Sequence, residues 1–151
     1  MSLKSEAKIK LARYCAYQER SQKEVRTRLS DLGIYGDLAE EIISELISDN
    51  YINEERFART FIGGKFRVKK WGRNKILQAI KPYDISDYCI KKGLDEIDEQ
   101  EYQNTLESVL RRKDQSLTEE NLYQRRNKIA KYAISRGFEP DLVWDWLKQH
   151  I

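Results

Sequence analysis

The sequence is poor in the residues that build metal centres, disulfide frameworks and nucleophilic active sites. It contains two cysteines, Cys15 and Cys89, and one histidine, His150, which is the penultimate residue. The cysteines lie 74 positions apart among helical, partly apolar neighbours, which favours two reduced, buried thiols over a disulfide or a metal site. No Ser/His/Asp or Cys/His arrangement is available for nucleophilic catalysis. We therefore expect no enzyme, and no catalytic residue, metal or cofactor.

Turn formers and membrane-spanning runs are scarce as well. Seven glycines and two prolines among 151 residues, with 35% charged residues, favour helices with short connections over a sheet protein rich in turns. The mean hydropathy is −0.78, and no uncharged apolar run approaches the roughly 20 residues that a bilayer span needs. The N-terminus lacks the apolar region of a signal peptide. We expect a helical, cytoplasmic protein that does not bind membranes.

Positive charge is concentrated in the middle of the chain. Residues 1–50 hold 8 basic and 9 acidic side chains, residues 51–97 hold 11 and 6, and residues 98–151 hold 9 and 10. The net charges of these segments are therefore −1, +5 and −1, and they sum to the +3 of the whole chain. A localised positive field attracts acidic partners, either nucleic-acid phosphates or an acidic protein surface.

A helix that ends at a turn recurs three times, with a period of 51 to 53 residues. Residues four apart share a helix face, and Gly or Asp can adopt the left-handed conformation that closes a helix before an apolar residue packs back. The matching positions, at offsets 4, 8, 12 and 13 from Ser21, Gly72 and Arg125, are Val25, Leu29, Gly33 and Ile34; Ile76, Ile80, Asp84 and Ile85; and Ile129, Ala133, Gly137 and Phe138.

Further helices complete each repeat. Leading helices are expected at about residues 7–19, 54–70 and 99–112, and the expected N-terminal caps or first residues of the flanking helices are Asp37, Asn53, Ser86, Asp98 and Pro140. The sequence thus predicts an all-α fold of three tandem three-helix, helix-turn-helix-like repeats, spanning residues 1–49, 50–97 and 98–151.

The leading helix of the middle repeat is predicted to be apolar on one side and cationic on the other. At about 100° per residue, Phe57, Phe61 and Val68 lie on the buried side. Like charges stacked on one helix face cost a few tenths of a kcal/mol each, so such a face favours an anionic partner. The cations on the opposite side are Arg56, Arg59, Arg67 and Lys70.

The stretch "KFRVKKWGRNKI", residues 65–76, continues this charge around a corner, with six cations and no acid. Gly63 lies on the cationic face of the predicted helix. Glycine in a helix interior costs about 1 kcal/mol relative to alanine. We interpret Gly63 as a kink or packing site, or as a place where a partner approaches the backbone. The candidate binding residues are Arg56, Arg59, Lys65, Arg67, Lys69, Lys70, Arg73 and Lys75.

Two stretches, "SQKEVRTRLSDLG" from Ser21 and "DNYINEERFARTFIGGKFRVKKWGRNKI" from Asp49, resemble the RecX family, whose members regulate the RecA recombinase. The resemblance covers about residues 8–148 and weakens after Asp95. It implies an elongated, curved array without enzymatic activity that binds RecA filaments on DNA. It also implies restraint of filament growth, strand exchange, ATP hydrolysis and coprotease activity in recombination and SOS regulation. We expect such a protein to be a monomer.

Two other functions compete with this one. A DNA-binding protein could use the same corner as a helix-turn-helix reader, and it would bind naked DNA tightly with a steep dependence on salt. The RecA-binding hypothesis includes at most a direct and weak contact with DNA through the basic middle repeat. We expect no second basic patch. The secondary candidates Arg125, Arg126, Lys128 and Lys131 have Glu119 and Glu120 nearby as partners, and we interpret Arg111, Arg112 and Lys113 as cations that complement the dipole of a helix end. A helical-repeat adaptor would need an exposed apolar groove, for which only Trp144 and Trp146 are candidates.

Overall fold

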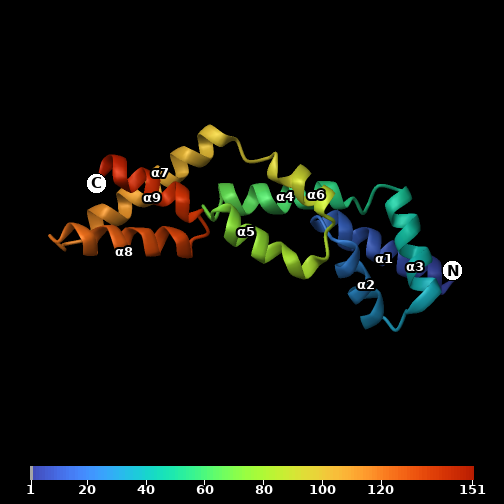
Figure 1. Cartoon of the computed structure of the whole chain (residues 1–151). Helices are drawn as coiled ribbons and strands as arrows, with labels where there is room; N and C mark the ends of the chain where they lie inside the picture. Colours follow the sequence, from blue (N-terminus) through green and yellow to red (C-terminus); the bar gives the residue numbers. More distant parts are fainter. Residues whose placement is uncertain (1) are drawn as a thin grey trace. The chain divides into compact units, whose positions relative to one another are not determined.

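The computed structural model describes residues 2–151, and within that range the chain is helical without a strand (Figure 1). None of the helices in this range is long and apolar enough to span a bilayer. The all-α prediction is therefore confirmed. The elements are α1 Leu3–Tyr17, α2 Gln22–Asp31, α3 Gly36–Ser48, α4 Glu54–Arg67, α5 Arg73–Ile80, the short 3₁₀ helix η1 Lys81–Tyr83, α6 Asp87–Leu94, α7 Glu99–Ser116, α8 Leu122–Ser135 and α9 Pro140–His150.

The helices form two compact units. The first contains the described residues up to Phe61 together with Lys81–Leu94, and the second contains Ile62–Ile80 and Asp95–Ile151. Helix α4 contributes its first half to one unit and its second half to the other.

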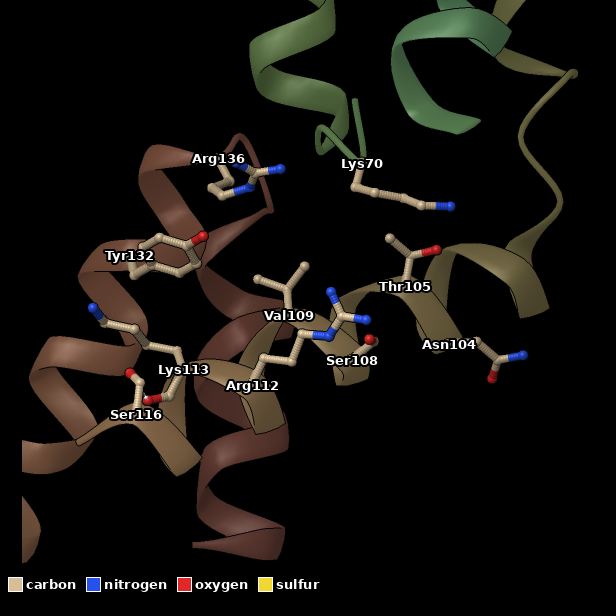
Figure 2. A pocket seen from close by; sticks show the side chains of 10 residues that line it. All are labelled: Lys70, Asn104, Thr105, Ser108, Val109, Arg112, Lys113, Ser116, Tyr132 and Arg136. Atoms are coloured by element: carbon tan, nitrogen blue, oxygen red, sulfur yellow. Dashed lines mark hydrogen bonds between the residues drawn. The ribbon is translucent and has the colours of Figure 1, made fainter. Parts of the chain in front are cut away.

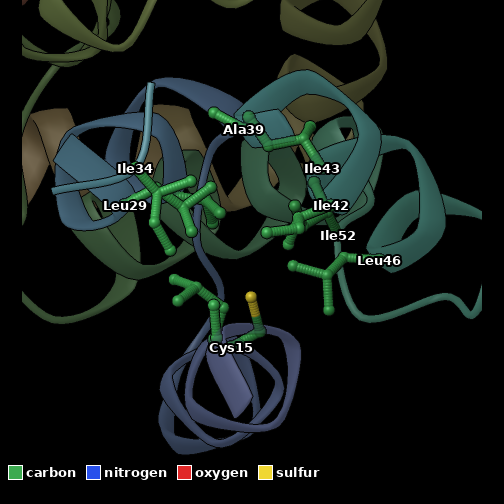
Figure 3. Packing of buried hydrophobic residues seen from close by; sticks show 11 residues of the cluster. Cys15, Leu29, Ile34, Ala39, Ile42, Ile43, Leu46 and Ile52 are labelled. Atoms are coloured by element: carbon green, nitrogen blue, oxygen red, sulfur yellow. The ribbon is translucent and has the colours of Figure 1, made fainter. Parts of the chain in front are cut away.

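The core of the first unit is built by α1, α2 and α3 (Figure 3). Leu11 and Cys15 are one turn apart on α1, as Val25 and Leu29 are on α2, so each helix buries a single face. Burial raises the pKa of the Cys15 thiol to about 11, which keeps it protonated at neutral pH. Both cysteines are free as predicted, although Cys89 is only half-buried.

The core of the second unit contains a row of aromatic rings. The ring centroids of Phe66 and Tyr102 are 5.7 Å apart, and those of Tyr102 and Phe138 are 5.4 Å apart, within the range of favourable aromatic pairs. Leu106 and Leu110 continue the buried face of α7 at intervals of four residues. This row connects α4, α7 and the turn after α8 in one apolar layer.

The three predicted repeat turns are present. Gly33, Asp84 and Gly137 have φ values of 79°, 54° and 100°, the left-handed conformation that the repeat required. The apolar residue after each of them is buried. In the first and third turns its N–H donates to the carbonyl oxygen five residues earlier, a bond that closes the helix end.

Most predicted helix starts are confirmed. The first leading helix was expected from about residue 7 but begins at Leu3, and one predicted cap is wrong. Pro140 is the first residue of α9. Asp37 was expected to cap α3, but α3 begins at Gly36 and has no side-chain cap. Asp37 instead places its carboxylate in the first turn, where it complements the helix dipole. The confirmed caps accept a backbone N–H at distances of 2.9 Å, 3.2 Å and 3.0 Å and belong to Asn53, Ser86 and Asp98 respectively.

Helix α4 is shorter than predicted. It ends at Arg67, and Lys70 has a φ of 58°, so Lys70 cannot continue the helical face that was expected to carry it. A left-handed non-glycine residue reverses the chain direction at the end of a helix. Lys70 therefore does not lie on the face of α4 that carries Arg56, Arg59 and Arg67. It belongs to the corner, which we define as residues 69–75.

Two glycine-containing turns of the second unit are in direct contact. The Gly72 N–H donates to the Arg136 carbonyl oxygen at 2.8 Å, and the Asn74 N–H donates to the Gly137 carbonyl oxygen at 2.9 Å. A Cβ atom on Gly72 would lie 2.3 Å from the Gly137 carbonyl carbon. Only glycines permit the two backbones to approach this closely.

We predict that Gly137→Ala lowers the free energy of unfolding by about 2 kcal/mol or more. The new Cβ would lie 2.4 Å from the Lys75 Cβ, at a φ of 100°. Gly64→Ala is the control, because its Cβ meets no atom within 4 Å inside a helix, where alanine gains about 0.5–1 kcal/mol. Urea denaturation should place the two variants on opposite sides of the parent protein. Equal midpoints would contradict the account of the turn contact.

Candidate functional site

The first two predicted binding residues of α4 are bound by the protein's own acceptors. Arg56 Nε lies 2.7 Å from Glu19 Oε2, and its Nη2 donates to the Asn50 carbonyl oxygen at 3.1 Å. Arg59 Nη2 lies 2.8 Å from Glu55 Oε1, one helical turn earlier. These arginines stabilise the first unit, and an anionic partner would have to compete with their present acceptors.

Arg67, in the second unit, lies over a glycine of its own helix. A Cβ on Gly63 would lie 2.3 Å from Arg67 Nη2, so the missing side chain makes room for the guanidinium group. Arg67 Nη1 is 3.9 Å from Glu96 Oε2, and the side chain remains about half exposed. Of the two interpretations of Gly63, packing within the protein agrees with this geometry.

Arg73 is the central residue of a half-buried polar network. Its Nη1 lies 2.9 Å from Glu139 Oε2, and it also pairs with Glu99. Its guanidinium carbon is 3.8 Å from the centre of the Tyr102 ring. The Tyr102 hydroxyl donates to Glu139 and accepts the Arg73 backbone N–H at 3.0 Å. Arg73 thus fixes the start of α5 against α7 and α9, which is a structural role.

The indole of Trp71 is flanked by two lysines of the predicted site. Lys65 Nζ is 5.2 Å and Lys75 Nζ is 4.5 Å from the centre of the ring, distances at which an ammonium group is attracted to the aromatic face. Lys69 and Lys70 are exposed, and within residues 2–151 neither forms an ion pair. The corner therefore offers the least compensated charges of the predicted set.

The sequence interpretation missed a cationic groove in the second unit. Its volume is about 650 Å³, and four of its lining residues are cations, whereas none of the described residues that line it is acidic. Figure 2 shows Lys70 and Arg136 on one side and side chains of α7 on the other. We call this the cationic groove; its lining residues are Lys70, Asn104, Thr105, Ser108, Val109, Arg112, Lys113, Ser116, Tyr132 and Arg136.

Two features of the fold place these side chains around the groove. Thr105, Ser108, Arg112 and Ser116 recur every three or four residues and therefore share one face of α7. The opposite wall is set by the contact between the turns, where Arg136 Nη2 donates to the Lys69 carbonyl oxygen at 2.8 Å. That hydrogen bond brings Arg136 of the third repeat beside Lys70 of the second.

The expectation that no second basic patch exists is therefore wrong. Arg112 and Lys113 do lie near the end of α7, where they complement the dipole, but they also line the groove. Figure 2 shows Arg112 extending toward Lys70 and Lys113 extending toward Tyr132. Lys113 Nζ is 4.9 Å from the centre of the Tyr132 ring. Only the fold brings together residues separated by more than sixty positions. The local signal was a helix face with hydroxyl side chains and two cations but no acid.

A metal centre is not part of either surface: in the described part of the chain, no group of His, Cys, Asp or Glu residues could hold an ion. The chemistry available at the corner and in the cationic groove is the binding of anions by ammonium, guanidinium, hydroxyl and amide groups.

Models of three RecX domains match consecutive parts of the chain. The first three-helix domain of RecX matches residues 7–46, the second matches residues 53–94 and the third matches residues 99–147. The third match covers α7, α8 and α9 and therefore includes most of the groove.

Curated proteins and solved structures agree with these matches. Regulatory protein RecX of Lactobacillus johnsonii is 36% identical over 89 residues, which are 59% of this chain and 33% of that protein. Regulatory protein RecX of Clostridium botulinum is 27% identical over 134 residues, 87% of this chain and 62% of that protein. The chain thus spans about a third to three fifths of the length of these relatives.

The crystal structure of RecX from Lactobacillus salivarius has a TM-score of 0.88 at 23% identity and covers 97% of this chain and 94% of that one. A second crystal structure, of a regulatory protein RecX, has a TM-score of 0.84 at 16% identity and covers 97% and 73%. At these identities the similarity establishes the fold, which consists of three-helix domains as predicted.

We predict that Tyr102→Phe lowers the free energy of unfolding by about 1–3 kcal/mol, because Glu139 and the Arg73 N–H lose their buried partner. Burial raises the pKa of Tyr102 above its ordinary value of 10. The unfolded chain therefore ionises first, and the advantage of the parent protein should be full below about pH 10 and shrink above it. Thermal denaturation at several pH values measures this. Tyr123→Phe, at a 77% exposed position, should change nothing, and an equal loss in both variants would contradict the prediction.

Proposed function

Because this chain belongs to the RecX family of regulatory proteins, we propose that it restrains the RecA recombinase by binding RecA filaments on DNA, without catalysing a reaction of its own. The observation that carries this proposal is the succession of three RecX domain matches along residues 7–147. The expected effects are limits on filament growth, strand exchange, ATP hydrolysis and coprotease activity, and hence on recombination and the SOS response.

We place the contact with the filament on the corner. Lys69 and Lys70 are exposed without an ion pair among the described residues, and Lys75 is bound only through the Trp71 ring. These ammonium groups can turn toward an anionic surface without breaking a salt bridge, so their electrostatic attraction is available to a partner. We keep Lys65 in the contact because its Nζ lies 5.2 Å from the centre of the same Trp71 ring.

The arginines of the predicted site contribute less to the filament contact than the lysines do in this proposal. Arg56, Arg59, Arg67 and Arg73 are paired with carboxylates of the chain, so a partner gains from them only what exceeds the lost pairing. We assign Arg67, which has the longest of these four ion-pair distances, to the filament contact and the other three mainly to the fold. The contact then requires the second repeat, with domain limits close to 50–97, and a monomer suffices for it.

We predict that the parent protein lowers ATP hydrolysis by RecA assembled on single-stranded DNA. Lys69→Glu/Lys75→Glu should require roughly tenfold more protein for the same inhibition, as expected when about 1.4 kcal/mol of binding is lost. The control is Lys131→Glu/Lys148→Glu, which makes the same charge change on α8 and α9. Circular dichroism should show the parent helix content in both variants.

Two results would count against this proposal. If the parent protein leaves ATP hydrolysis unchanged at saturating concentration, the chain does not restrain RecA filaments. If both double variants inhibit as well as the parent protein does, the corner is not the contact, whatever the effect of the parent protein on RecA.

A further inference from the structure

We propose that the cationic groove binds the phosphate backbone of a single strand of nucleic acid. This inference rests on the proposed function, since a RecA filament contains such a strand, and it assigns a partner to the third three-helix domain. It differs from the contact on the corner in its ligand and largely in its place, because the groove lies mainly on α7 and α8 and shares only Lys70 with the corner among the described residues.

The donors in the groove are those that hold phosphodiesters. Phosphate oxygens in complexes are bound by Arg and Lys together with short hydroxyl and amide side chains. The groove supplies four cations together with neutral donors. These donors, Asn104, Thr105, Ser108 and Ser116, lie along about 18 Å of α7 at 1.5 Å per residue. A row of neutral donors beside the cations suits a chain of regularly spaced phosphates.

The cations of the groove also lack carboxylate partners among the described residues. Within residues 2–151, none of Lys70, Arg112, Lys113 and Arg136 forms an ion pair, whereas Arg56, Arg67 and Arg73 each have a carboxylate partner. Four positive groups that line one hollow without a neighbouring acid repel one another, and a polyanion relieves that repulsion while it releases its counterions. Arg136 is already oriented by its hydrogen bond to the Lys69 carbonyl oxygen, so less conformational entropy is lost on binding.

The dimensions favour one strand over a double helix. A volume of about 650 Å³ is that of a pocket for a drug-sized ligand and admits a short stretch of one strand, but no duplex. Tyr132 is 37% exposed at the edge of the groove, where its ring can contact a sugar or an unstacked base. A duplex offers no unstacked base for such a contact.

The test is fluorescence anisotropy of a labelled single-stranded oligonucleotide of mixed sequence, without RecA, for the parent protein and for Arg112→Glu/Lys113→Glu. Two fewer phosphate contacts should weaken binding roughly tenfold at about 0.1 M salt and reduce the slope of log K against log salt by about 1.4. Arg112→Lys/Lys113→Arg should retain both the affinity and the slope, since it keeps the charges.

The matched control is Lys91→Glu/Lys92→Glu. Lys91 and Lys92 also lie near the end of a helix, α6, and one of them is exposed and the other half-buried, which is equally true of Arg112 and Lys113 in α7. Both double variants therefore change the net charge by the same amount and place acidic residues at a similar position relative to a helix dipole. Equal weakening in both variants, tighter binding of a duplex of the same sequence, or binding of a poly-glutamate peptide in preference to the oligonucleotide would each overturn the proposal. Thermal unfolding of each variant shows whether a loss of binding reflects a loss of fold.

The two proposals can fail separately. If the parent protein inhibits RecA but does not bind the oligonucleotide, the groove proposal fails and the proposed function stands. If it binds the oligonucleotide through the groove without inhibiting RecA beyond what competition for DNA explains, the groove proposal stands and the proposed function fails.

Discussion

The contact between two turns is the constraint on which the second unit depends. Gly72 and Asn74 donate backbone hydrogen bonds to the turn after α8, and the Arg136 side chain returns one to the carbonyl oxygen of Lys69. Because Gly72 and Gly137 lack side chains, the two backbone segments can come close enough to form these hydrogen bonds. It places the start of α5 beside the end of α8, and it sets one wall of the cationic groove.

The charges of the protein fall into two groups that the sequence does not distinguish. In the first group, arginines such as Arg56 and Arg73 are paired with carboxylates and hydrogen-bonded to backbone or aromatic groups, which makes them part of the fold. The second group, which includes Lys70 and Arg112, lines surfaces without acids. An electrostatic partner gains most from the second group, because it displaces only water and counterions there.

Local patterns predicted the helices, the left-handed turns and most caps, because each depends on residues a few positions apart. Asp84 is an example, since its place before Ile85 in the repeat predicts a left-handed conformation, and its φ is 54°. The ion pairs of the site were not predictable in this way. Arg56 meets Glu19 across 37 positions, and Arg136 reaches the backbone of Lys69 across 67. The end of α4 was also missed, because the alternation of lysines with Val68 and Trp71 suits a helix until the corner reverses the chain.

Amide hydrogen exchange at the turn contact tests the central claim most directly. The account predicts that the N–H groups of Gly72 and Asn74, which lie at or before the first turn of α5 and lack partners within that helix, exchange nearly as slowly as amides in the core of α8, such as that of Ala133. Their protection should derive from the Arg136 and Gly137 carbonyl oxygens. Exchange of both groups at the rate of an unstructured peptide, with α8 still protected, would contradict the contact and, with it, the position of the groove.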